Sequence, residues 1–173
     1  GDVDFDKLVE AGFEFTFIKA TEGGKTVDEN FSLYWKAAAA AGLLRGAYHY
    51  YSPDDDPVSQ ARIFYKTIMK TGDAGELPPV LDVEKPPLAP DQIKACLDAL
   101  EKLLGKRPII YTRPNLWDEM GGVPWAQDYP LWVAQYPYKD WSDDLPKRLL
   151  ADKPKLPRDW STWVFWQFTD KAP

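Results

Sequence analysis

Short apolar runs alternate along the chain with longer amphipathic stretches, and this alternation predicts strands separated by helices. We predict strands where apolar and β-branched residues cluster, at 13–20, 44–51, 79–84, 108–112, 130–136 and 162–168. Helices are predicted between them at 31–42, 57–70, 90–104 and 114–120, several opened by proline or closed by glycine. No helix is predicted between the last two strands. Such alternation is typical of right-handed βαβ units in a parallel sheet.

Composition narrows the class of protein. The 173 residues suffice for one domain with a substantial core, but they are few for a complete β/α barrel, which has eight strands and roughly 250 residues. Cys96 is the only cysteine and His49 the only histidine, which excludes a disulfide scaffold and argues against a His/Cys zinc site. A net charge of -6 argues against a dedicated nucleic-acid binder, and no apolar run is long enough to span a bilayer. The 8 Trp, 9 Tyr and 8 Phe suit a core, and beside carboxylates they also suit stacking on sugar rings.

Two acids end the apolar segment 79–84. Asp82 and Glu84 are two positions apart, which in a strand places both side chains on one face. The carboxyl end of a parallel strand is also where barrel active sites are built. Two carboxyl groups held close cannot easily both ionise, so one pKa rises and supplies a proton donor beside an anion. Glycoside hydrolysis needs such a pair, whereas the plainer alternative is a solvated strand end.

Two other motifs have mainly structural interpretations. In GAYHYY, Tyr48 and Tyr50 share one strand face, and His49 on the other is predicted to be a hydrogen-bonded core or loop histidine. A Ser-His-Asp triad stays open, although no G-x-S-x-G motif is present. IKATEGG lacks the P-loop pattern, so Lys19 and Glu22 are predicted to form a structural ion pair. Aromatic residues at strand ends are expected mostly in packing, with one or two facing a cleft: Tyr111, Trp132, Tyr136, Trp166 and Phe168.

Together these segments resemble the glycoside hydrolase family 25 lysozymes, the Chalaropsis-type muramidases. The matching stretches are AGFEFTFIKATEGG, AAGLLRGAYHYYSPDDDPVSQARIF, LPPVLDVE, RPIIYT, YPLWVAQY and WSTWVFWQFTD, in order and over nearly the whole chain. The resemblance implies an irregular β/α (TIM-like) barrel whose last strands lack intervening helices. It implies an extracellular or phage-borne lysozyme that cleaves the β-1,4 bond between N-acetylmuramic acid and N-acetylglucosamine. The implied partner is the peptidoglycan glycan strand, and the implied enzyme is a monomer with no metal, cofactor, nucleic acid or membrane.

The resemblance also implies site residues. Glu84 corresponds to the general acid of the family. Asp82 corresponds to its partner, which orients the N-acetyl group of the substrate while that group attacks the anomeric carbon. The positions implied to line the cleft are Glu22, Tyr48, Tyr111, Trp132, Gln167 and Asp170.

The chain departs from the family pattern at both ends. Family members begin with a strand ending in a Gly-x-Asp motif and finish with a Val-Asp-x-Asn-type strand, and neither motif is present. We therefore expect residues 1–173 to be a single catalytic domain, a fragment that lacks the first and last barrel strands. Asp2 and Asp4 are expected in the loop after the first strand and without a catalytic role.

Two other functions stay open from the sequence. A non-catalytic peptidoglycan-binding module is favoured by the missing first-strand Asp. Another barrel glycosidase, such as a chitinase-like hydrolase, would also place D-x-E at a strand end.

Overall fold

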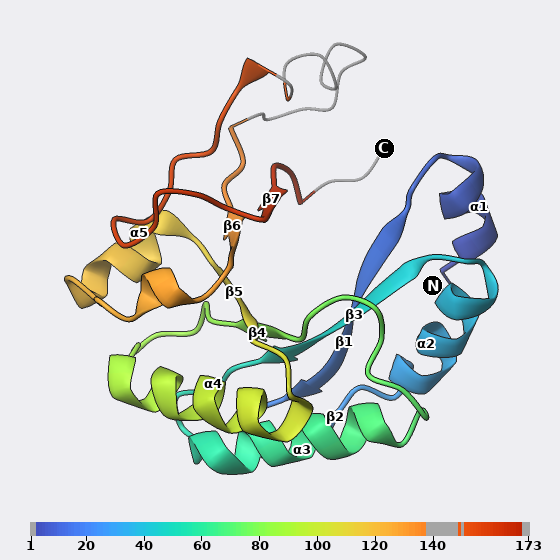
Figure 1. Cartoon of the computed structure of the whole chain (residues 1–173), viewed down its shortest axis with the longest axis horizontal. Coiled ribbons are helices and arrows are strands. Elements are labelled where there is room, and N and C mark those ends of the chain that lie inside the picture. Colours follow the sequence, from blue (N-terminus) through green and yellow to red (C-terminus); the bar gives the residue numbers. More distant parts are fainter. Residues whose placement is uncertain (1–2, 138–148, 150, 171–173) are drawn as a thin grey trace. The chain divides into compact units, whose positions relative to one another are not determined.

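The computed structural model describes residues 3–137, 149 and 151–170. The chain forms two units, 1–109 and 110–173 (Figure 1). In the first unit, β1 (Phe15–Glu22), β3 (Leu44–Tyr50) and β4 (Val80–Asp82) are parallel neighbours. A short strand, β2 (Thr26–Val27), pairs antiparallel with the end of β1. The three parallel strands confirm predictions, whereas β2 was not predicted because two residues carry no periodicity.

Helices surround these strands, and their ends follow the sequence signals. The first unit contains α1 (Phe5–Glu10), α2 (Phe31–Ala40), α3 (Pro57–Met69) and α4 (Pro90–Leu104). The last of these starts at proline and ends before Gly105, which takes the left-handed conformation, as predicted. The predicted ranges of α2 and α3 are confirmed within one or two residues.

The helix α1 was not predicted, although Asp4, which we expected in a loop, does lie just outside this helix. Asp4 is the N-cap of this helix, and its carboxylate accepts a hydrogen bond from the Lys7 backbone N–H at 3.2 Å. The cap satisfies one of the amide groups that the first turn leaves without an intrahelical partner. Phe5, the first helical residue, is buried. A six-residue helix is too short to give a clear apolar period in the sequence.

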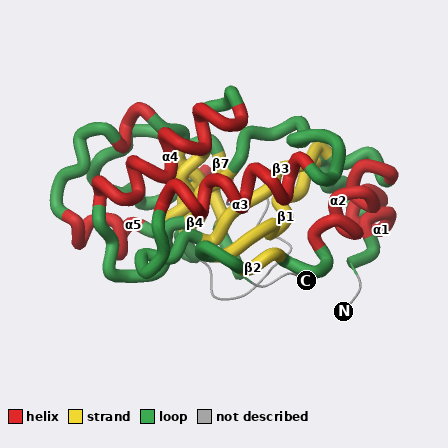
Figure 2. Tube along the Cα trace, turned by 90° about the horizontal axis from the view of Figure 1, so that it is seen from below, coloured by secondary structure: helices red, strands yellow, loops and turns green. Residues whose placement is uncertain are grey.

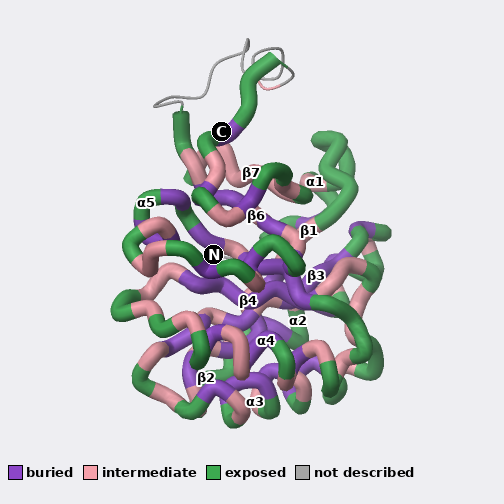
Figure 3. The backbone as a smooth tube through the Cα atoms, turned by 60° about the vertical axis from the view of Figure 1, so that its left-hand side comes forward, coloured by how far each residue is buried: buried purple, intermediate pink, exposed green. Residues whose placement is uncertain are grey.

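The core of the first unit lies between its strands and the helices α3 and α4. These two helices run side by side across the strands (Figure 2). Figure 3 shows the buried backbone passing through the strands of this unit. The large side chains that the layers share are fully buried, among them Phe64, Ile68, Leu81, Ile93 and Leu97. This packing holds the carboxyl ends of β1, β3 and β4 in a fixed arrangement.

The second unit has its own strands and an aromatic core. Its strands β5 (Ile109–Thr112), β6 (Leu131–Ala134) and β7 (Phe165–Gln167) are parallel where they pair, β5 with β6 and β6 with β7. The predicted helix at 114–120 is α5 (Pro114–Trp117) followed by a 3-10 turn, and another such turn spans Ala126–Asp128. Fully buried Trp117 packs edge-on against Trp160 at 4.7 Å. Its indole N–H donates to Asp159 Oδ2 at 2.9 Å.

No helix among the residues described above is long and apolar enough to cross a membrane.

Candidate active site

The strand β4 ends at Asp82, and Glu84 follows two residues later. We predicted a strand through Glu84, but pairing with β3 stops at Asp82, whose partner is Tyr50. The Asp82 carbonyl accepts a hydrogen bond from the Tyr51 backbone N–H at 2.9 Å, which ties the end of β4 to β3. Val83 is fully buried between the two acids, Asp82 is 7% exposed and Glu84 is intermediate. One carboxyl of the pair is therefore enclosed by protein, and the other reaches solvent.

The Asp82 carboxyl is the group with a strongly shifted pKa. Burial raises its pKa to about 8, and the nearby charges of Glu84 and Glu22 raise it further, while Lys19 acts in the opposite direction. Its Oδ1 atom is buried without a hydrogen-bond partner among the residues that the structure describes. The sequence predicted one raised pKa in this pair, and the proton donor implied by the family resemblance was Glu84. The structure instead raises the pKa of Asp82, because Asp82 is the more deeply buried of the two acids. Burial therefore favours the neutral form of Asp82, and its Oδ1 atom is available to a hydrogen-bond donor from a ligand.

Two tyrosines on β3 complete the surroundings of the acids. Burial raises the pKa of Tyr48 to about 12, and the charges of Asp82, Glu84 and Glu22 add to this effect. The pKa of Tyr50 is also raised, by burial and then by Glu84 and Asp82. Both phenols therefore keep their protons at neutral pH, and each is a neutral group able to donate a hydrogen bond.

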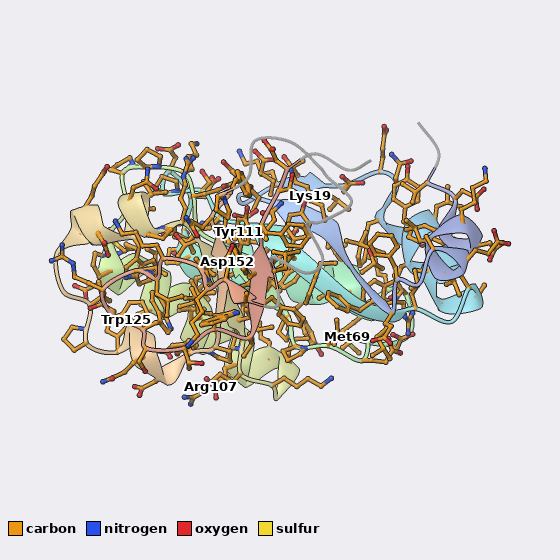
Figure 4. The ribbon with its side chains drawn as sticks, turned by 90° about the horizontal axis from the view of Figure 1, so that it is seen from above. Lys19, Met69, Arg107, Tyr111, Trp125 and Asp152 are labelled. Carbon is orange, nitrogen blue, oxygen red and sulfur yellow. The ribbon has the colours of Figure 1, made fainter. Side chains whose placement is uncertain are left out.

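Lys19 contributes a positive charge to this cluster. Its ammonium group lies 2.6 Å from Glu22 Oε2, which confirms the predicted ion pair, and 5.3 Å from the centroid of the Tyr50 ring. Figure 4 labels Lys19 on β1. Together with Tyr48, it lines a cavity of about 250 Å³ that extends along β1 to α1. A smaller cavity of about 220 Å³ is lined by Glu22, by Gly23–Gly24 and by Asp55.

His49 has the structural role predicted for it. It is fully buried, its ring lies 5.7 Å from that of Phe64, and both nitrogens have partners, Thr21 Oγ1 at 2.7 Å and Gln60 Oε1 at 3.0 Å. Burial lowers its pKa to about 4. A neutral, doubly hydrogen-bonded ring is not poised as the base of a Ser-His-Asp triad.

A second group of candidates lies in the unit 110–173. The phenol of Tyr111 donates to Gln167 Oε1 at 2.6 Å, and that of Tyr136 donates to the same atom at 3.0 Å. Trp132 packs edge-on against Tyr111 at 5.0 Å. Because both phenols donate to the amide oxygen, the amide nitrogen of Gln167 is left as a donor. Asp170 is exposed at the bend after β7.

The structure therefore divides the predicted residues between the two units. Glu22, Tyr48, Asp82 and Glu84 meet at the carboxyl ends of β1, β3 and β4, while Tyr111, Trp132 and Gln167 form the group described above. The residues that we did not predict for the site are Tyr50, Lys19 as part of the electrostatics, and Asp28, whose charge acts on Tyr48. Tyr136 was one of the aromatic candidates at the strand ends. Tyr50 had a usable signal, since it shares a strand face with Tyr48.

Metal binding has no support within the described ranges, where no group of three or more His, Cys, Asp or Glu side chains is arranged to hold an ion.

Comparisons with known proteins agree on one family. The model of the glycosyl hydrolases family 25 matches residues 1–173. The uncharacterised protein YegX of Escherichia coli K12 is 38% identical over 165 residues, which cover 92% of this chain and 54% of YegX. Lysozyme M1 of Streptomyces globisporus is 30% identical over 185 residues, covering 98% of this chain and 58% of the relative. The chain thus spans little more than half the length of these relatives.

Solved structures confirm the barrel-like α/β class. The muramidase from Acremonium alcalophilum superposes with a TM-score of 0.79 at 27% identity, covering 99% of this chain and 84% of the muramidase chain.

Proposed function

The chain belongs to the glycosyl hydrolases family 25, and from this membership we propose that it is a muramidase, a lysozyme that cleaves peptidoglycan. The bond cleaved is the β-1,4 linkage between N-acetylmuramic acid and N-acetylglucosamine. Relatives named lysozyme and muramidase support this proposal. The single observation that carries it is the pair at the end of β4, where Asp82 is enclosed with one unpartnered oxygen and Glu84 reaches solvent.

The proposed reaction assigns one role to each acid. The carboxyl of Glu84 gives its proton to the glycosidic oxygen as the bond from that oxygen to the anomeric carbon breaks. The acetamido oxygen of the substrate forms a bond to the anomeric carbon, while Asp82 Oδ1 accepts a hydrogen bond from the acetamido N–H. Water then attacks the same carbon, gives a proton to Glu84 and releases the acetamido group.

The burial of Asp82 suits this role. A buried carboxyl group that is costly to ionise is stabilised most when a ligand brings a hydrogen-bond donor to its unpartnered oxygen. The acetamido N–H is such a donor, and it becomes more acidic as the acetamido oxygen bonds to the anomeric carbon. The interaction therefore strengthens in the transition state, which is the condition for it to accelerate the reaction.

The other residues are proposed to bind the glycan. Glu22 and Tyr48 border the acids in the first unit. In the second unit, Tyr111 and Trp132 offer ring faces to sugars, Gln167 offers its amide nitrogen, and Asp170 is a further polar contact. We propose that the protein is a monomer that acts on the cell wall, either secreted or borne by a phage.

Digestion of purified peptidoglycan tests the proposal. Mass spectrometry should detect new reducing ends at N-acetylmuramic acid, and Glu84→Gln should lower the rate by about 10²- to 10⁴-fold because the proton donor is lost. The matched control is Glu29→Gln, which removes an exposed carboxyl from the loop before α2 and should leave the rate unchanged. The activity should follow a bell-shaped pH profile on the acidic side, and a flat profile would argue against paired carboxyls.

The same digestion separates the alternatives. Wall binding without new reducing ends would indicate a non-catalytic module, and faster hydrolysis of chitin than of peptidoglycan would indicate a chitinase-like enzyme. Normal wall clearing by Glu84→Gln would refute the assignment of the acid.

A further inference from the structure

The pairing of β1 with β3 is interrupted by one extra residue. Lys19 is opposite Tyr48, but the next pair is Thr21 with His49, so Ala20 has no partner on β3. Such an insertion is a β-bulge, which turns the following residues to the other face of the sheet. The burial pattern agrees, because Ala20 and Thr21 are buried in succession where a regular strand would alternate.

The bulge determines which way Glu22 points. Residues three apart on a regular strand lie on opposite faces. Across the bulge, Lys19 and Glu22 lie on the same face, and their charged groups are 2.6 Å apart. Their partners on β3 are Tyr48 and Tyr50, the two tyrosines beside the acids. Without the bulge, Glu22 would face away from Asp82 and Glu84.

A buried hydrogen-bond network spans the bulge. The hydroxyl of Thr21, the first residue after the insertion, lies 2.7 Å from His49 Nδ1, and His49 Nε2 lies 3.0 Å from Gln60 Oε1 on α3. All three residues are fully buried. The amide nitrogen of Gln60 donates to the carbonyls of Ser52 and Asp55 at 2.8 and 3.0 Å, while its oxygen accepts from the Ser52 N–H at 2.9 Å.

These contacts define every proton in the network. Because the Gln60 nitrogen serves two carbonyls, its oxygen must face His49, so His49 carries its hydrogen on Nε2. Nδ1 is then an acceptor, and the Thr21 hydroxyl donates to it. A protonated ring would place a second hydrogen at Nδ1 against that hydroxyl. The charges near His49 are Glu22 and Asp55, which favour protonation, and Lys19, which opposes it; burial outweighs them and lowers the pKa to about 4.

The same network also anchors the loop after Glu22. Gln60 holds the backbone of Asp55, and the Asp55 carboxylate accepts a hydrogen bond from the Gly24 N–H at 3.0 Å. Gly23 has a φ of +54°, and a Cβ there would lie 2.6 Å from Asp55 Oδ2, so only glycine fits. Glu22 is thus held on one side through Thr21 and on the other through Gly23–Gly24, and both routes lead to Gln60.

We propose that Thr21, His49 and Gln60 form a positioning unit that fixes the bulge at Ala20 and keeps Glu22 and Lys19 facing the catalytic acids. The unit rests on the proposed muramidase function, since its purpose is to order the cleft. None of its three side chains touches the substrate. Its effect on the reaction passes through Glu22.

Kinetics on soluble peptidoglycan fragments test this claim with a matched pair of variants. Thr21→Val keeps the shape and removes the hydroxyl, and it should lower kcat/KM by about ten-fold because the cleft carboxylate is misplaced. Thr21→Ser keeps the hydroxyl and should stay within about two-fold of the wild type. In a Glu22→Gln background, Thr21→Val should cause no further loss, because interacting sites are not additive. A general loss of packing would instead add to the effect of Glu22→Gln.

The tautomer is measured directly in the wild-type protein, whose single histidine gives one set of ring ¹⁵N signals by NMR. We expect the hydrogen on Nε2, and a hydrogen on Nδ1 would overturn the network even if Thr21→Val does not fold. Suppose the wild type is active but Thr21→Val has a normal kcat/KM, or its loss adds to that of Glu22→Gln. This result would reject the positioning unit and leave the proposed function standing. A wild type that releases no reducing ends would reject the proposed function, and with it the catalytic purpose of the unit.

Discussion

Replacing Asp82 by asparagine should stabilise the protein at neutral pH while it impairs activity. The pKa of Asp82 rises from 3.8 in the unfolded chain to about 8 in the folded one. Between these values the unfolded chain has released the proton and the folded protein has kept it. The unfolding free energy therefore decreases as pH rises above about 4, and below that pH Asp82 no longer destabilises the folded state.

The size of the effect follows from the shift. One pKa unit corresponds to about 1.4 kcal/mol, so at pH 7, roughly three units above the unfolded value, Asp82 costs about 4 kcal/mol of folding free energy. The amide in Asp82→Asn is neutral at every pH and escapes this cost. The difference in unfolding free energy between variant and wild type should therefore be smallest at pH 4 and increase by about 4 kcal/mol up to pH 7.

Urea unfolding at several pH values between 4 and 8 measures this difference. Far-UV circular dichroism is a suitable signal because it reports α1 to α4, which belong to the same unit as Asp82. The change of the difference with pH isolates the ionisation, since pH-independent effects of the amide on packing cancel. Glu29→Gln, which neutralises an exposed carboxyl, should follow the wild type. A difference that stays constant, or that shrinks as pH rises, would refute the desolvation of Asp82.

Three further predictions concern the framework of the first unit. The pKa of His49 is lowered from 6.5 to about 4, so the unfolded state binds more protons than the folded state between these pH values. The unfolding free energy measured in urea should therefore fall by about 3 kcal/mol as pH drops through this window. An NMR titration that showed an ordinary histidine pKa would contradict this prediction. Gly46→Ala should lower the unfolding free energy by about 1–3 kcal/mol, since a Cβ there would collide with the Phe17 ring, and an unchanged urea midpoint would show that the ring can move. Arg45→Met should lower the unfolding free energy by about 2 kcal/mol in the same assay, because the nearly buried guanidinium donates to Glu76 at 2.8 Å. An unchanged unfolding free energy would mean that this ion pair does not stabilise the fold.

The elements with strong local signals were predictable from the sequence alone. The fifteen-residue helix α4 has a proline at its start, glycine after its end and a clear apolar face, so its bounds agree with the structure. All six predicted strands exist, although most are shorter than their apolar segments. The D-x-E spacing located Asp82 and Glu84, because a motif at a strand end is a local feature. The helix α1 was not predicted, because it has only six residues and its only sequence signal is the N-cap Asp4.

Tertiary structure alone decided how the acids and Glu22 are arranged. FTFIKATE has the pattern of an ordinary alternating strand, and nothing in it marks Ala20 as an insertion. A bulge is a property of pairing with β3, whose residues lie nearly thirty positions further along the chain. The division of roles between the acids is likewise non-local. Spacing predicts that one carboxyl of the pair keeps its proton, and the family resemblance pointed to Glu84 as the proton donor. The raised pKa belongs to Asp82 instead, because burial depends on all the elements that pack around the end of β4.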